Sequence, residues 1–161
     1  MDLDLKGKTI IITGGSGGIG QGLVMEFARE GCNVVSASRD AATGQKLAQE
    51  AKQQGLPGRV LAVATDVTQR ASVEAMIEKA NQQFGPIDGL VNNAGGVAHP
   101  AAFAELDEEA RRWEIALNID GVVNCCQAVA RDMLALGRGS IVNISSNSSL
   151  LGEAAAGVAH Y

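Results

Sequence analysis

The stretch that decides the fold is TGGSGGIG, residues 13 to 20, which directly follows three isoleucines at positions 10–12. Five of its eight positions are glycine and two carry hydroxyl groups. The β-branched run before it is typical of a buried strand, and the residues after it have helical spacing. A glycine-rich turn at this place suits a phosphate group, because a helix N-terminus offers unpaired N–H groups and the positive end of its dipole.

The glycines have separate expected tasks. Gly14 permits a sharp turn, Gly18 lets a pyrophosphate approach the backbone, and Gly20 lets the helix pack closely on the strand. The lysine of a P-loop is absent, so that class of phosphate site is excluded. A tight turn without any ligand is the alternative, and the strand before it and the helix after it argue against that alternative. The predicted phosphate-binding residues are Gly14, Ser16, Gly18, Ile19 and Gly20.

Outward from this turn, strand-like and helical patterns alternate along the whole chain. Strands are predicted at 9–12, 33–38, 59–65, 87–91 and 140–144, and helices at 18–30, 42–54, 68–84 and 107–136. The first helix is predicted to present Ile19, Leu23 and Phe27 with Val24 to the core, and the third to present Val73, Met76, Ile77 and Ala80. Parallel strands need crossover helices, so the pattern predicts an α/β fold with a doubly wound parallel sheet.

Composition narrows the class of protein. The chain has 161 residues, enough for one domain spanning 1–161, with 46% hydrophobic and 19% charged residues. Thirteen basic and eighteen acidic residues give a net charge of −5, which disfavours nucleic acid as the main partner. The cysteines Cys32, Cys125 and Cys126 have no metal-ligand spacing, and we expect reduced thiols and no metal. No signal peptide or membrane-length apolar run occurs, so we expect a cytoplasmic protein that does not enter a membrane.

Further motifs follow the glycine turn in a fixed order. They are Asp66-Val67 after the third strand, Asn92-Asn93-Ala94-Gly95 after the fourth, Asn118 with Gly121, the run 139–146 ending in Ser145-Ser146, and Tyr161. With them the whole chain resembles the short-chain dehydrogenase/reductase family of the classical type. The resemblance implies a Rossmann-type sheet, of which this chain holds five of the expected strands. It also implies cofactor contacts from Asp66, Val67, Asn93, Ala94 and Gly95.

The residues that end the second strand bear on the choice of cofactor. In such folds an acidic residue there favours the free ribose of NAD, and an arginine accommodates the 2′-phosphate of NADP. Ser38 stands where the NAD-type members of the family carry aspartate, and Arg39 follows it. The pair favours NADP(H), with NAD left open because Asp40 lies one residue further on.

The resemblance also implies a mechanism of hydride transfer between the nicotinamide and a ketone or secondary alcohol. Tyr161 would protonate the forming alkoxide, Ser146 would hydrogen-bond the carbonyl oxygen, and Asn118 would hold a water. Ser148 is the second choice for the serine, since its distance of 13 residues to Tyr161 is the common one and that of Ser146 is 15. An unperturbed tyrosine has a pKa near 10 and needs a cation to act as a base, and the family has a lysine four residues after its tyrosine. The chain ends at 161, so we expect a truncated, inactive form.

Two functions of different classes remain at this point. The first is an NADP-dependent oxidoreductase of the short-chain type, whose complete form acts on a small molecule and assembles as a homodimer or homotetramer. The second is a non-catalytic nucleotide-binding module with a regulatory or interaction role. A lysine at position 165 would favour the enzyme. The sequence does not identify the substrate.

Overall fold

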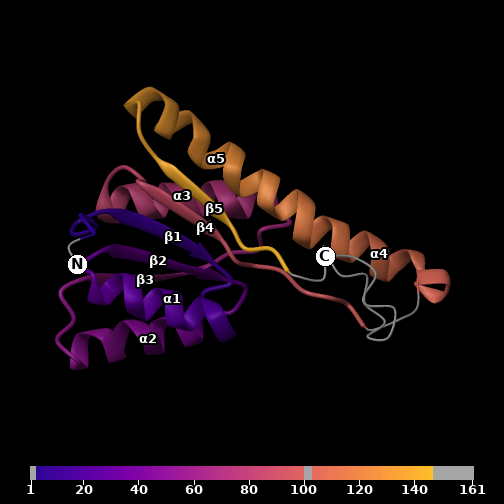
Figure 1. The fold of residues 1–161 in the computed structure, drawn as a ribbon, viewed down its shortest axis with the longest axis horizontal. Helices are drawn as coiled ribbons and strands as arrows, with labels where there is room; N and C mark the ends of the chain where they lie inside the picture. Colours follow the sequence, from indigo (N-terminus) through magenta and orange to yellow (C-terminus); the bar gives the residue numbers. More distant parts are fainter. Residues whose placement is uncertain (1–2, 100–102, 147–161) are drawn as a thin grey trace.

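The computed structural model describes residues 3–99 and 103–146, and it holds one parallel sheet between two layers of helices (Figure 1). Five strands form the sheet in the order β3-β2-β1-β4-β5. Their bounds are β1 Thr9–Thr13, β2 Asn33–Ser38, β3 Arg59–Ala64, β4 Gly89–Asn92 and β5 Ser140–Asn143. Every pairing is parallel, so the predicted fold class is confirmed.

Helices cover both faces of the sheet (Figure 1). Their bounds are α1 Gly18–Arg29, α2 Ala41–Gln53, α3 Arg70–Phe84, α4 Glu108–Ile115 and α5 Gly121–Leu136, with a short 3-10 turn η1 at Phe103–Glu105. Successive residues of β1 supply the two cores, because side chains alternate along a strand. Ile10 and Ile12 pack with α1 and α2, and Ile11 packs with α3 and α5.

The first helix packs largely through the predicted face, since Val24 is buried and Leu23 and Phe27 pack against the core, but Ile19 does not. The buried residues of α1 are Gly20, Val24 and Ala28, while Ile19 is 66% exposed. A Cβ on Gly20 would overlap the carbonyl oxygen of Gly14, so the helix approaches the glycine turn through Gly20. This close approach turns Ile19 outward. The predicted face of α3 is confirmed.

The helix predicted over 107–136 is interrupted. The π-helical turn η2, Ala116–Asp120, joins α4 to α5, and the three segments form one long rod (Figure 1). Asp107 caps this rod by accepting the N–H of Ala110 at 2.8 Å. A π turn holds one extra residue within a helix and is frequent at functional sites. Here it contains Asn118.

Candidate cofactor cleft

A cleft of about 490 Å³ lies at the carboxyl edge of the sheet. The strand order reverses between β1 and β4, and ligands of open parallel sheets bind at such a switch point. Ten of the twelve predicted cofactor contacts line the cleft. They are Gly14, Ser16, Gly18, Ile19, Ser38, Arg39, Val67, Asn93, Ala94 and Gly95.

The glycine turn forms one wall of the cleft. Gly14 has φ +65°, and a Cβ there would lie 2.9 Å from the Cα of Ala94. Gly18 has φ +35° and nothing within 4 Å of the position of a Cβ, so free space faces the first residue of α1. Gly20 does not line the cleft, since its role is the close contact with Gly14.

Thr13 holds the two walls of the cleft together, a role that its sequence pattern does not predict. Its hydroxyl donates to the carbonyl of Val91 at 3.4 Å and accepts the N–H groups of Asn93 and Ala94 at 3.0 Å each. One donated and two accepted bonds are all that a hydroxyl can make. The side-chain amide of Asn93 donates in return to the carbonyls of Thr13 and Gly14. The segment after β4 is thereby fixed against the glycine turn.

At the end of β2, three consecutive residues have different partners. The hydroxyl of Ser38 donates to the carbonyl of Asp40 at 2.6 Å. The carboxylate of Asp40 caps α2 by accepting the N–H of Ala42 at 2.8 Å. Arg39 is exposed, lines the cleft, and forms no ion pair with any residue in the described part of the chain. Its guanidinium is available to a ligand, and Asp40 beside it lines the cleft as well as capping the helix.

After β3, Asp66 and Val67 are placed differently. Val67 is buried and lines the cleft. The carboxylate of Asp66 is not part of the lining and accepts the backbone N–H and the hydroxyl of Thr68, at 3.0 and 2.8 Å. This is a local turn that leads into α3.

Asn118 lies in the π turn and is paired with the backbone after β4. Its side-chain oxygen accepts the N–H of Gly96 at 2.9 Å, and its amide donates to the carbonyl of Gly96 at 2.8 Å. Leu117, the residue before it, lines the cleft. Each polar atom of the Asn118 amide can make one more hydrogen bond. Asn118 is therefore both an anchor for this segment and a polar group near the end of the cleft.

The three predicted serine and tyrosine positions lie on or beyond the limit of the described residues. Ser146 is half-buried and follows β5 at the carboxyl edge, where the N–H of Ile144 donates to the carbonyl of Asn92 at 2.9 Å. Ser148 and Tyr161 lie outside the described residues. The arrangement of serine, tyrosine and asparagine stays a prediction.

The cysteines are poor candidates for chemistry. Burial raises the pKa of Cys125 to about 12, with the neighbouring Cys126 as the second cause. Burial likewise raises the pKa of Cys32 to about 11, with smaller contributions from Glu30 and Asp88. Both thiols stay protonated at neutral pH, and the thiolate is the reactive form. Within the described residues no cluster of histidine, cysteine and acidic side chains is suited to a metal ion, and no helix has the length and apolar character needed to cross a membrane.

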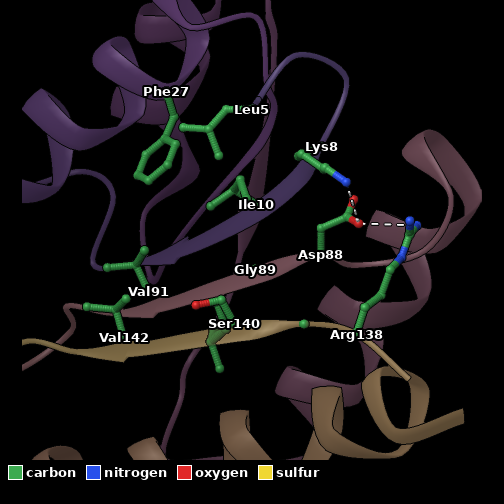
Figure 2. A pocket seen from close by; sticks show the side chains of 12 residues that line it. Leu5, Lys8, Ile10, Phe27, Asp88, Gly89, Val91, Arg138, Ser140 and Val142 are labelled. Atoms are coloured by element: carbon green, nitrogen blue, oxygen red, sulfur yellow. Dashed lines mark ion pairs between the residues drawn. The ribbon is translucent and has the colours of Figure 1, made fainter. Parts of the chain in front are cut away.

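A second hollow, of about 340 Å³, lies on the α1 side of β1, β4 and β5 (Figure 2). Apolar side chains from these strands and from α1 line most of it, among them Ile10, Phe27 and Val142. At one end the carboxylate of Asp88 faces two cations, Arg138 at 3.2 Å and Lys8 at 3.8 Å. None of the residues predicted to bind the cofactor or the substrate lines it, so the cleft at the carboxyl edge is the candidate site.

Fold and cleft together define a Rossmann-type domain of the dehydrogenase class. The chain belongs to the short chain dehydrogenase family, whose sequence profile matches residues 8–161. It is 38% identical over 149 residues to the 3-oxoacyl-(acyl-carrier-protein) reductase FabG of Thermotoga maritima, a match that covers 92% of this chain and 59% of that protein.

Two solved structures are similar to this chain over most of its length. A short-chain type dehydrogenase/reductase from Mycobacterium marinum superimposes with a TM-score of 0.86 at 34% identity, over 94% of this chain and 62% of that one. A 7α-hydroxysteroid dehydrogenase, solved with NADH and 7-oxo glycochenodeoxycholic acid, superimposes with a TM-score of 0.84 at 33% identity, over 91% and 56% of the two chains. The chain thus spans about three fifths of the length of these relatives.

The residues of the cleft fit a nicotinamide dinucleotide, the type of cofactor that the family uses. The open space at Gly18 faces the N-terminus of α1, where a phosphate group is favoured by unpaired N–H groups and by the helix dipole. The lining then runs from Arg39 at the end of β2 to Gly95 after β4, which is a long and mostly uncharged surface.

Proposed function

We propose that this chain forms the cofactor-binding part of an NADP(H)-dependent oxidoreductase that interconverts a carbonyl compound and a secondary alcohol. The observation that carries the proposal is the cleft itself, which is lined by the open helix N-terminus at Gly18, by Asn93 after β4, and by Arg39, an arginine with no ion pair among the described residues. In this arrangement Ser16, Gly18 and the first turn of α1 bind the pyrophosphate. The adenosine end lies toward Arg39 and Val67, and the nicotinamide end toward Asn93, Ala94 and Gly95.

The preference for NADP(H) rests on the partners of Arg39 and Asp40. A 2′-phosphate beside the guanidinium of Arg39 would gain a charge-assisted, bidentate hydrogen bond. An acidic side chain directed at the ribose would instead favour NAD. Ser38 rather than an acidic residue ends β2, and one carboxylate oxygen of Asp40 accepts the N–H of Ala42 as the cap of α2.

The reaction needs three groups of this chain, in the roles that the family resemblance implies. When bound, the reduced nicotinamide supplies a hydride to the carbonyl carbon. Ser146 donates a hydrogen bond to the carbonyl oxygen, Tyr161 donates the proton that this oxygen gains, and Asn118 holds a water that returns a proton to Tyr161. For the whole protein we propose a small ketone or alcohol as substrate, a cytoplasmic location, and assembly as a homodimer or homotetramer.

The cofactor preference is tested by fluorescence titration of the 161-residue chain with NADPH and NADH. NADPH should bind more tightly, by about tenfold or more, which corresponds to about 1.4 kcal/mol. Arg39→Asp should reverse the order, and Arg131→Asp on α5 should leave it unchanged because Arg131 is exposed and does not line the cleft. Tighter binding of NADH by the parent chain would refute the proposed preference.

Turnover is tested on a chimaera that continues past Tyr161 with the corresponding segment of the Thermotoga maritima relative. The chimaera should oxidise NADPH in the presence of a ketone panel, and Tyr161→Phe should abolish the reaction without changing NADPH affinity. Binding with no turnover on any ketone or alcohol would instead support the non-catalytic nucleotide-binding module.

A further inference from the structure

The segment after β4, residues 95–99, is fastened along the rod of α4 and η2 at three points. Asn118 exchanges two hydrogen bonds with Gly96, and the carboxylate of Glu114 accepts the N–H of Ala98 at 3.0 Å. One step further along, the Nε2 of His99 lies 3.4 Å from the carboxylate of Asp107. The segment and the helix run in opposite directions, so residues later in the segment contact residues earlier in the helix.

Glu114 is the unusual member of this series. It is only 2% exposed, and burial of a carboxylate is costly unless it receives hydrogen bonds. On α4 it lies one turn after Ala110, which is 5% exposed, and one turn before Asn118. An apolar side chain would satisfy packing at such a position. The carboxylate is therefore explained by the backbone N–H group that it binds.

The fastened segment begins in the cofactor cleft. Ala94 and Gly95 line the cleft, and a Cβ on Gly95 would lie 3.0 Å from the side-chain oxygen of Asn118. Ala98 is two residues from Gly96, which binds Asn118, and three residues from Gly95, which lines the cleft. A displacement of Ala98 would therefore also move these two residues. In the contact between His99 and Asp107 both side chains are exposed, so we expect it to contribute little to stability.

We propose that Glu114 is a positioning residue for the nicotinamide end of the cleft. This inference rests on the proposed function, since it assumes that a dinucleotide occupies the cleft with its nicotinamide toward Gly95. By holding Ala98, Glu114 keeps residues 94–96 in the arrangement that receives the nicotinamide. If this arrangement is populated in only one tenth of the molecules, the apparent dissociation constant rises about tenfold.

The test compares two ligands of the 161-residue chain, NADPH and adenosine 2′,5′-bisphosphate, which carries the adenosine end alone. Glu114→Leu removes the acceptor, and its NADPH dissociation constant should rise about tenfold while that of the bisphosphate stays the same. A role in overall folding alone would weaken both ligands together. Glu114→Gln keeps an oxygen acceptor and should bind both ligands like the parent chain.

Glu109→Leu is the matched control, since Glu109 is exposed on the same helix. It should leave both affinities unchanged. Equal NADPH affinity in Glu114→Leu and the parent would overturn the role of Glu114 while the proposed function stands. A parent chain that binds neither ligand would overturn the proposed function and this inference with it.

Amide hydrogen exchange of the parent chain provides a measurement that needs no variant. The N–H of Ala98 should exchange at least about tenfold more slowly than that of an exposed amide, because its partner is a buried carboxylate. Protection should be lost in Glu114→Leu and retained in Glu114→Gln. Exchange of Ala98 in the parent at the rate of an exposed amide would overturn the proposal, even if both variants at Glu114 failed to fold.

Discussion

Two buried hydroxyl groups near the carboxyl edge of the sheet differ in their hydrogen bonding. The hydroxyl of Thr13 makes three hydrogen bonds. That of Ser36 on β2 is fully buried, lies against Gly15 and Gly44, and has no hydrogen-bond partner among the described residues. A satisfied buried hydroxyl stabilises the fold, and an unsatisfied one costs free energy.

Removal of the two hydroxyl groups should therefore change stability in opposite directions. Ser36→Ala should raise the free energy of unfolding by about 1 kcal/mol, and Thr13→Val should lower it by about 1 to 3 kcal/mol. Urea unfolding followed by circular dichroism measures both. Loss of stability in Ser36→Ala would mean that the hydroxyl has a partner in solution.

A substitution at Gly18 would affect both ligand binding and backbone conformation. Gly18→Val places a branched side chain in the space assigned to the pyrophosphate, at a φ of +35° that L-residues rarely adopt. NADPH affinity should fall by at least about tenfold, or about 1.4 kcal/mol. Gly22→Ala is the control on the same helix, where a Cβ also meets nothing, and it should bind NADPH normally. Equal affinity in both variants would assign the glycine turn to backbone geometry alone.

At the scale of elements, the opposite, amino edge of the sheet is held by a charge cluster. Asp88 precedes β4 and accepts the N–H of Thr9 at 3.0 Å, the first residue of β1. It also faces Lys8 and Arg138, which precede β1 and β5 (Figure 2). One carboxylate with a side-chain exposure of 15% thus joins the starts of three strands.

Loss of this carboxylate should destabilise the sheet. Asp88→Ala should lower the free energy of unfolding by about 1.5 to 3 kcal/mol, because the N–H of Thr9 and two cations lose their partner. Glu74→Ala breaks an exposed pair with Arg70 and should cost less than about 1 kcal/mol. Thermal unfolding of the two variants checks the comparison, and equal losses would show that Asp88 acts only as a surface charge.

Some elements of the structure could be predicted from local sequence patterns, and others could not. The strands could be predicted within about two residues because β-branched runs and glycine stops are local signals. The π turn at Ala116–Asp120 could not be predicted, because one extra residue hardly changes the periodicity of a helical sequence. In the sequence, Glu114 resembles an ordinary solvent-exposed charge. Its role becomes visible only in the fold, where residues 95–99 pack against it. Thr13 stands inside the quoted motif, yet its partners lie about 80 residues away.

At the scale of the molecule, β5 leaves one edge of the described sheet uncovered. Ile141, Val142 and Ile144 are 39, 48 and 45% exposed. Exposed apolar strands at a sheet edge promote pairing between molecules. We therefore expect the 161-residue chain to self-associate in a concentration-dependent manner.

Sedimentation velocity over a range of concentrations tests this expectation. Val142→Lys should shift the chain toward monomer, because charged side chains protect edge strands. Leu134→Lys is the control on α5, where the side chain is 80% exposed, and it should change association little. A parent chain that remains monomeric at all concentrations, or an equal effect of the two lysine variants, would contradict pairing through β5.

The position of the cleft along the chain has a consequence for synthesis on the ribosome. Among the described residues, those that line it lie between Gly14 and Leu117, and they are translated before Ser146 and Tyr161. A ligand that binds only folded protein adds to its stability. The proposed nucleotide contacts are thus made before Ser146 and Tyr161, and a nucleotide bound there stabilises the fold that carries it.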